Sequence, residues 1–193
     1  MKEIKKSNSL ISNLTRKVRK IMLVLSSIIV LCAIALTIIL LIHSPGKVKP
    51  LLDENGNVIK GSISEKVYTK INGVNIGMII KSKDASNPVL LFVHGGPGMP
   101  EYPVTEKYPT GLEEHFTVVW FDQRGAGLSY KSDMIKEKMT TEQFVSDTIE
   151  VSKYLRERFG QDKIYLMAHS WGSYIGIQAA VKAPELYKAY IGI

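Results

Sequence analysis

The stretch Lys163-Ile-Tyr-Leu-Met-Ala-His-Ser-Trp-Gly-Ser-Tyr-Ile-Gly176 decides the fold class of this chain. It opens with a largely apolar run of six residues, which predicts a buried strand. The segment after the run carries small residues at Gly172 and Gly176, and its composition predicts a helix that packs closely against a sheet. Only His169 and Ser170 separate strand from helix, so the chain must turn sharply there.

The neighbouring sequence extends this strand and helix into a layered domain. Other apolar runs predict further strands, at residues 89–93, 116–121 and 189–193. Runs that are apolar on both faces suit buried parallel strands. Two earlier segments, 66–71 and 74–80, flank Asn72-Gly73, a strong hairpin signal. Helical patterns occupy residues 140–160 and 171–183. The alternation predicts a doubly wound, mostly parallel α/β sheet after an antiparallel hairpin.

Near the N-terminus, residues 21–42 form an uncharged, apolar run. As a helix it spans about 33 Å, and a hydrocarbon core is about 30 Å thick. The run exceeds the roughly 7–15 apolar residues of a cleaved signal peptide, so we expect an uncleaved signal anchor. Seven basic residues precede it, whereas only Lys47 and Lys49 follow closely. This asymmetry predicts a single-pass protein in the cell membrane, with a cytoplasmic N-terminus and an extracytoplasmic domain.

Charge and cysteine content exclude several classes of function. The net charge is +7, but residues 1–20 hold seven basic residues and one acidic residue, so the remainder is nearly neutral. We therefore expect no nucleic-acid partner. The single cysteine, Cys32, allows no disulfide framework, and no His or Cys pair has zinc-ligand spacing. The predicted organisation is a basic tail (1–20), a transmembrane helix (21–42), a linker (43–62) and a domain (63–193), without metal or cofactor.

The turn at Ser170 has the layout of a nucleophile elbow. In such an elbow the serine adopts a strained backbone conformation, and the residues two before and two after it must be small. Here these are Ala168 and Gly172. An ordinary helix N-cap serine is the alternative. His169 adjoins the serine, and we expect its ring to point away rather than to act as the base.

A glycine-rich loop, His94-Gly-Gly-Pro-Gly98, directly follows the strand at 89–93. When a hydroxyl attacks a carbonyl, negative charge develops on oxygen, and fixed backbone N–H groups stabilise it. Glycines let the backbone approach a substrate. We expect the N–H groups of Gly96 and of Trp171, at a helix N-terminus, to form this oxyanion hole. The other residues of the loop are expected to shape it: His94, Gly95, Pro97 and Gly98.

With a third motif, Phe121-Asp-Gln-Arg-Gly-Ala-Gly-Leu-Ser129, these segments resemble the α/β-hydrolase superfamily, and within it the proline iminopeptidase branch of serine peptidases. The resemblance covers residues 63–193. It implies an α/β-hydrolase fold and removal of an N-terminal proline, or another residue, from a small peptide, with Ser170 as nucleophile. A cap domain inserted after this part would largely determine the substrate. We expect Asp122 and Arg124 to hold their loop by hydrogen bonds rather than to catalyse.

The triad in this fold runs Ser, then Asp or Glu, then His, yet only one acid, Glu185, and no histidine follow Ser170. Glu185 lies at a helix end, on the wrong side for a triad acid. We therefore expect a C-terminally incomplete domain, and we expect these 193 residues alone to be inactive and poorly soluble. For the intact protein, two alternatives stay open: an esterase, lactonase or epoxide-type hydrolase acting on an acyl or related substrate, and a non-catalytic membrane protein.

Overall fold

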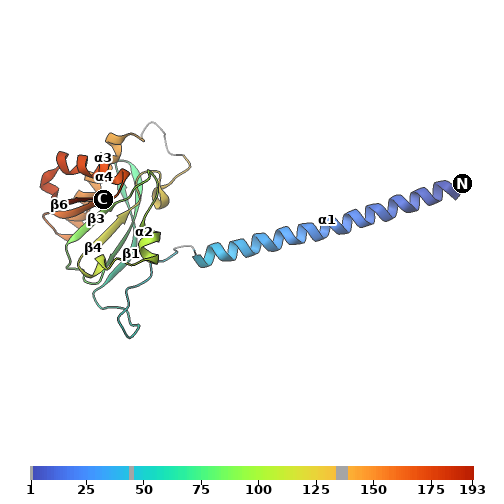
Figure 1. Ribbon diagram of the computed structural model, residues 1–193, viewed down its shortest axis with the longest axis horizontal. Coiled ribbons are helices and arrows are strands. Elements are labelled where there is room, and N and C mark those ends of the chain that lie inside the picture. Colours follow the sequence, from blue (N-terminus) through green and yellow to red (C-terminus); the bar gives the residue numbers. More distant parts are fainter. Residues whose placement is uncertain (1, 44–45, 134–138) are drawn as a thin grey trace. The chain divides into compact units, whose positions relative to one another are not determined.

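Figure 1 shows the computed structural model, which describes residues 2–43, 46–133 and 139–193. The chain divides into two units, Met1–Gly46 and Lys47–Ile193. Among the described residues, the first unit contains helix α1, and the second contains the strands. We describe each unit by itself.

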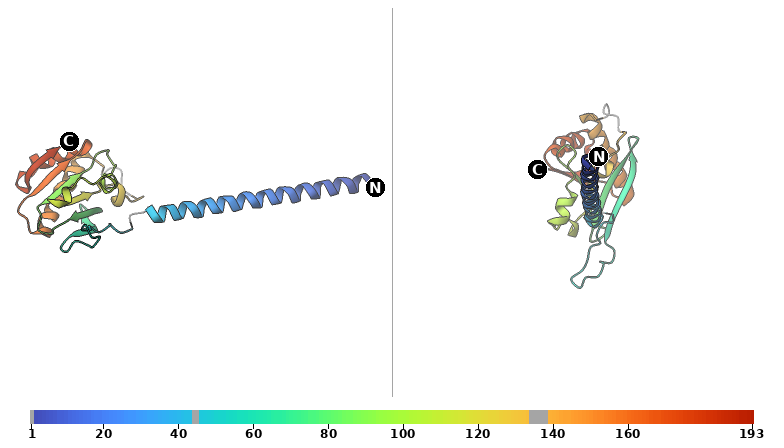
Figure 2. Two further views of the ribbon diagram at one scale, coloured as in Figure 1. Left: turned by 60° about the horizontal axis from the view of Figure 1, so that its bottom comes forward. Right: turned by 90° about the vertical axis from the view of Figure 1, so that its right-hand side faces the viewer.

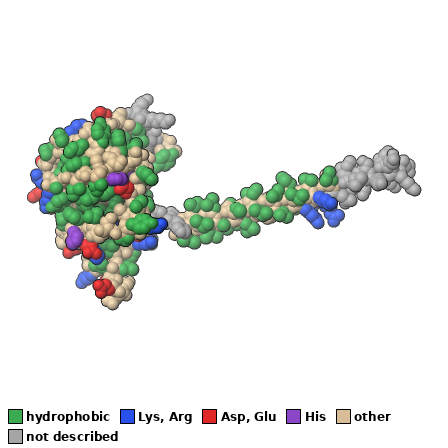
Figure 3. All heavy atoms as spheres, in the orientation of Figure 1, with side chains coloured by type: hydrophobic (Ala, Val, Ile, Leu, Met, Phe, Trp, Pro, Cys, Tyr) green, Lys and Arg blue, Asp and Glu red, His purple; other side chains and the backbone are tan. Residues whose placement is uncertain are grey.

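Helix α1 (Lys2–His43) is longer than the apolar run predicted from the sequence, because the basic tail is helical as well. Its part Leu14–Ile42 is long and apolar enough to be a candidate membrane span. On the face seen in Figure 3, hydrophobic side chains follow a basic cluster along this helix. Three hydroxyl side chains donate to carbonyls three or four residues earlier, which satisfies them without water: Ser26, Ser27 and Thr37.

The second unit is built on a six-stranded sheet with the order β1-β2-β4-β3-β5-β6. The strands are β1 (Ile63–Ile71), β2 (Val74–Ser82), β3 (Val89–Val93), β4 (Thr117–Phe121), β5 (Ile164–Ala168) and β6 (Tyr187–Gly192). Strand β2 is antiparallel to both β1 and β4, and the other pairs are parallel. This confirms the predicted mixed α/β sheet with an antiparallel entry hairpin.

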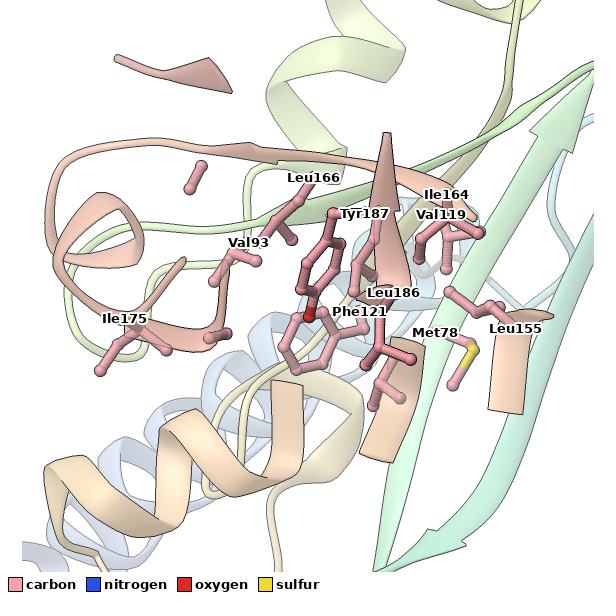
Figure 4. Packing of buried hydrophobic residues seen from close by; sticks show 14 of the residues in the cluster. Met78, Val93, Val119, Phe121, Leu155, Ile164, Leu166, Ile175, Leu186 and Tyr187 are labelled. Atoms are coloured by element: carbon pink, nitrogen blue, oxygen red, sulfur yellow. The ribbon is translucent and has the colours of Figure 1, made fainter. Parts of the chain in front are cut away.

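Helices and short 3-10 turns connect these strands. They are α2 (Tyr102–Lys107), η1 (Leu112–Glu114), η2 (Gly127–Ser129), α3 (Thr141–Phe159), α4 (Trp171–Lys182) and η4 (Pro184–Leu186). Helices α3 and α4 pack against each other and against the sheet (Figure 1). Between them and the sheet lies the larger apolar core, part of which is seen in Figure 4. A smaller core on the other face includes Tyr102 of α2.

Strand β3 explains why continuous apolar runs predicted the strands correctly. Val89, Leu91 and Val93 belong to the larger core, whereas Leu90 and Phe92 belong to the smaller one. All five residues are buried. Both faces of the strand are therefore covered, and neither has room for a polar side chain.

The observed ends of several elements differ from the predicted ones. Strand β1 begins at Ile63, because Ile63 pairs with Ser82 in the hairpin seen in Figure 2. Strand β6 begins at Tyr187 rather than at residue 189, because Tyr187 is buried and its hydroxyl lies 2.9 Å from Ser152 Oγ. Pairing and burial thus extend strands beyond what the apolar pattern shows.

Helix α3 starts where it was predicted, and its first turn has one of the two hydrogen bonds of a capping box. The Thr140 side chain accepts a hydrogen bond from the N–H of Gln143, at 3.2 Å. The Gln143 side chain does not return to Thr140 but donates to Asp147 Oδ1, at 3.0 Å. The helix ends, as predicted, at Gly160, whose φ of 62° closes it in the left-handed conformation.

The segment expected as a linker lies partly within the second unit. Val48 packs against the smaller core, and Leu52 pairs with Val58 in an isolated antiparallel bridge. Lys49 is also part of this segment. Its Nζ lies 3.9 Å from Oε1 of Glu106 in α2. The contacts of Val48 and Lys49 attach the start of this segment to the domain, whereas the bridge pairs residues within the segment.

Candidate active site

Ser170 lies at the carboxyl end of β5, in the conformation that the sequence pattern predicted. Its φ and ψ are 54° and −120°, a strained combination for a residue with a side chain. Two backbone hydrogen bonds hold the turn: the Ser170 N–H donates to the carbonyl of Ile193, after β6, at 2.9 Å, and the Ser170 carbonyl accepts from the Ser173 N–H at 2.9 Å. The side chain is exposed. The turn therefore presents the hydroxyl to solvent.

The small residues around this turn are required by close backbone contacts. A Cβ on Gly172 would overlap the carbonyl oxygen of Val93 and lie 2.7 Å from that of His94. A Cβ on Gly176 would lie 2.9 Å from the Cβ of Ala168. Real Cβ atoms do not approach other atoms so closely. The start of α4 can therefore pack here only with glycine at positions 172 and 176.

The glycine loop and the elbow lie side by side because their strands are neighbours. Strands β3 and β5 pair in parallel, with Val93 opposite Ala168, so both segments leave the sheet at the same level. A Cβ on Gly95 would lie 3.1 Å from Ser170 Cβ. The two motifs that the sequence analysis combined are thus in contact.

Two backbone N–H groups at this junction, those of Gly96 and Trp171, have no hydrogen-bond acceptor among the described residues. Trp171 is the first residue of α4, where N–H groups have no acceptor within the helix. Gly96 has a φ of 118°, which favours glycine. Within the part of the chain that the structure describes, neither N–H donates to a protein acceptor. Both are the donors predicted for an oxyanion hole.

His94 organises the start of the loop and has no free ring nitrogen. Its Nδ1 lies 2.8 Å from the carbonyl of Gly95, and its Nε2 accepts the N–H of Gln123 at 3.0 Å. Burial lowers the pKa of His94, against the opposing effects of the Gly95 carbonyl and the Glu101 charge. The ring is therefore neutral at pH 7, with its proton on Nδ1 facing Gly95.

The Asp122 carboxylate holds the loop that follows β4. It accepts the N–H of Leu128 at 2.6 Å, and a side chain on Gly127 would overlap it. Burial raises the pKa of Asp122 to about 6, although the Leu128 hydrogen bond acts in the opposite direction. These contacts agree with a structural role for this motif.

Arg124 forms a buried ion pair with Asp147 of α3. Its Nε and Nη2 donate to the two carboxylate oxygens, each at 2.8 Å, and both side chains are 1% exposed. Asp147 also accepts from Asn72 at 2.8 Å and from Gln143 at 3.0 Å. The carboxylate thus joins the hairpin turn, the loop after β4 and α3.

One residue near Ser170, Glu101, was not identified from the sequence. Its Oε1 accepts the N–H of Gly95 at 3.2 Å and lies 2.6 Å from Nδ1 of His169. His169 points toward this carboxylate, in agreement with the expectation that it is not the base. An acid eight residues after a predicted strand carries no periodic signal, so only its position after the glycine loop could have indicated this contact.

A pocket of about 350 Å³ lies beside both motifs. Its walls include Pro97 and Gly98 of the glycine loop, together with Phe144 and Trp171. These two rings are perpendicular, with centroids 6.2 Å apart. The volume falls within the roughly 300–1,000 Å³ range of small-molecule sites. Trp171 thus contributes its side chain to the pocket wall and its backbone N–H to the junction described above.

Glu185, the acid that follows Ser170 in the sequence, is exposed, as is His115. Glu185 belongs to η4, before β6. Among the described residues, no group of three or more His, Cys, Asp or Glu could hold a metal ion.

Comparison with known proteins identifies a matching family and a similar protein. Residues 88–193, more than half of the chain, match the family with the alpha/beta hydrolase fold. A probable aminopeptidase of Bacillus subtilis, YbaC, is 40% identical over 134 residues, which are 69% of this chain and 42% of that protein. The chain thus spans about two fifths of this curated relative.

Solved structures agree on the fold. A proline iminopeptidase-related protein of Thermus thermophilus has a TM-score of 0.57 and 28% identity, over 67% of this chain and 44% of that one. An epoxide hydrolase of Vigna radiata has a TM-score of 0.56 and 26% identity, over 67% and 39%. With the sheet order, the strained turn and the family match in agreement, this protein belongs to the α/β-hydrolase fold family and resembles its proline iminopeptidase branch.

Proposed function

We propose that the intact protein is a serine hydrolase that releases the N-terminal residue of peptides, with Ser170 as its nucleophile. One observation carries this proposal: an exposed serine at positive φ ends β5, against a glycine loop with a free N–H group. A serine that merely capped a helix would accept from its first turn, and Ser170 makes no side-chain capping bond.

In this proposal, Ser170 Oγ attacks the carbonyl carbon of the first peptide bond. The carbonyl oxygen becomes an oxyanion that the N–H groups of Gly96 and Trp171 stabilise, each donor contributing about 3 kcal/mol. The amine then leaves with a proton, and water hydrolyses the acyl-enzyme.

The attack requires a base. Within the described residues, no hydrogen bond joins Ser170 Oγ to a histidine, and both His94 nitrogens are engaged. We assign the base and its acid partner to other parts of the intact protein, because the curated relative is more than twice as long as the stretch it shares.

A peptide substrate is favoured over an epoxide by the nucleophile. An epoxide opened by serine would leave an alkyl ether on Oγ, which water does not readily cleave, whereas a carbonyl gives a hydrolysable ester. The name of the Bacillus relative also supports an aminopeptidase. The pocket walls, with Pro97, Phe144 and Trp171, would suit proline or another compact apolar residue.

The same proposal includes a single-pass membrane anchor. The apolar part of α1 is long enough to span a bilayer, and the basic residues before it favour a cytoplasmic N-terminus. The hydrolase domain would then face the outside. Protease treatment of intact cells should remove the domain, and full protection would contradict this orientation.

The test uses the full-length protein, prolyl and alanyl p-nitroanilides, an acyl p-nitrophenyl ester and an epoxide, together with a serine-reactive phosphonate. We expect hydrolysis of the amides and stoichiometric labelling, both lost in Ser170→Ala. Ser86→Ala is the matched control, because Ser86 is an exposed loop residue before β3, at the other end of that strand from the glycine loop. Labelling that persists in Ser170→Ala would refute the proposal.

A further inference from the structure

Glu101 has an unusual role for a residue that precedes a helix. Its carbonyl accepts from Val104 and Thr105 in the first turn of α2, at 2.9 and 3.1 Å. Its side chain, however, makes no capping bond to that helix. The carboxylate turns instead toward the elbow, where Oε1 meets the N–H of Gly95 and the ring of His169. The side chain is thus available for a function beyond capping.

These contacts join three segments at the candidate site. Glu101 belongs to the start of α2, Gly95 to the glycine loop, and His169 directly precedes Ser170. Gly95 also packs on the elbow, since a Cβ there would lie 3.1 Å from Ser170 Cβ and 3.2 Å from the His169 carbonyl. The carboxylate therefore spans the contact between loop and elbow.

The position of Gly95 determines that of the next peptide group, which carries the Gly96 N–H. Gly96 itself has no hydrogen bond from its N–H among the described residues, so the placement of this donor depends on the residues beside it. A displacement of about 1 Å is enough to impair an oxyanion donor, because such bonds are effective only near 2.7–3.1 Å.

We propose that Glu101 and His169 form a clamp that holds the glycine loop against the elbow and so positions the Gly96 N–H. Both act as positioning residues. The clamp is a property of the fold, and its catalytic consequence rests on the proposed function. The His169 side chain is 48% exposed and that of Glu101 22%, so solvent weakens the pair without separating it.

The first experiment measures the clamp without any catalysis. Hydrogen exchange of the full chain in detergent is followed by mass spectrometry of peptides that cover residues 93–99. We expect Glu101→Ala to raise exchange at Gly95 about tenfold or more, because a charge-assisted bond is lost. Glu101→Gln keeps an acceptor and should stay near wild type. Glu114→Ala is the control, since it removes an exposed pair with Lys83.

The second experiment measures the consequence in the full-length enzyme. For Glu101→Ala and His169→Ala we expect kcat to fall about tenfold, with KM within about twofold, since a lost oxyanion contact affects the transition state. Glu101→Gln should restore most of kcat. Unchanged exchange in Glu101→Ala would overturn the clamp, as would a variant that changes KM alone. A wild-type protein without hydrolysis would refute the proposed function, and the exchange result would still decide the clamp.

Discussion

The buried pair between Arg124 and Asp147 gives the sharpest test of how this domain is held together. Arg124→Met removes both guanidinium bonds and leaves a carboxylate that is 1% exposed with only Asn72 and Gln143 as donors. Breaking one side of a buried pair costs about 3–5 kcal/mol, because the remaining charge stays desolvated. For a domain with a total stability of about 5–15 kcal/mol, this is a large loss.

The matched variant Asp147→Leu should cost a similar amount, since it leaves the guanidinium without an acceptor. The double variant removes both charges, so we expect it to be more stable than the sum of the single effects by at least about 2 kcal/mol. The comparison pair is Lys153 with Glu150, at 2.7 Å and about half exposed. Glu150→Ala should change stability by no more than about 0.5 kcal/mol.

The assay is urea unfolding of the full chain in detergent, followed by tryptophan fluorescence, with Trp120 buried in the smaller core as a reporter. Equal m-values across the variants would show that the same transition is compared. If Arg124→Met and Glu150→Ala have equal effects, or if the two single effects simply add in the double variant, the assignment of a structural ion pair to this motif is wrong.

Three further variants test other parts of the argument by the same unfolding assay. Gly172→Ala should destabilise the domain by about 3 kcal/mol or more, because its Cβ overlaps the Val93 carbonyl; a neutral effect would contradict the tight elbow. The pKa of Asp122 is raised to about 6, above its usual 3.8, so its ionisation should lower the stability of the domain as pH rises from about 4 to 6. Asp122→Asn should remove this decline, which is worth at most about 3 kcal/mol. Identical pH profiles of wild type and variant would contradict the raised pKa. Thr140→Ala should cost about 1 kcal/mol through the lost bond to Gln143, and Thr140→Ser should keep most of it.

The sequence predicted those parts of the site that depend on the backbone. A strand of buried residues, a two-residue turn and a glycine two positions later leave few possible conformations, so the elbow at Ser170 and its contact with the glycine loop followed from local pattern. The helical pattern predicted over residues 140–160 has the same kind of basis, since Phe144, Val151 and Leu155 recur at helical spacing and are buried.

The parts that could not be predicted depend on tertiary contacts between polar side chains. A charged helix residue such as Asp147 is ordinarily expected to face solvent. Asp147 is nevertheless only 1% exposed, because it pairs with Arg124 from a loop 23 residues earlier in the sequence. Glu101 reaches His169 across 68 residues of sequence. Neither pair has a sequence spacing that distinguishes it from surface side chains, since the fold alone determines which side chain each carboxylate meets.

The pairing of β3 with β5 has a consequence for how such a protein can change its specificity. Because Val93 lies opposite Ala168, the pairing of two strands aligns the two segments of the proposed site, the turn at Ser170 and the loop that carries the Gly96 N–H. The pocket-wall residue Phe144 comes from α3, which is not part of this strand pair. Residues such as Phe144 could therefore be exchanged for larger or smaller ones in the course of evolution, and the geometry of attack would be inherited unchanged.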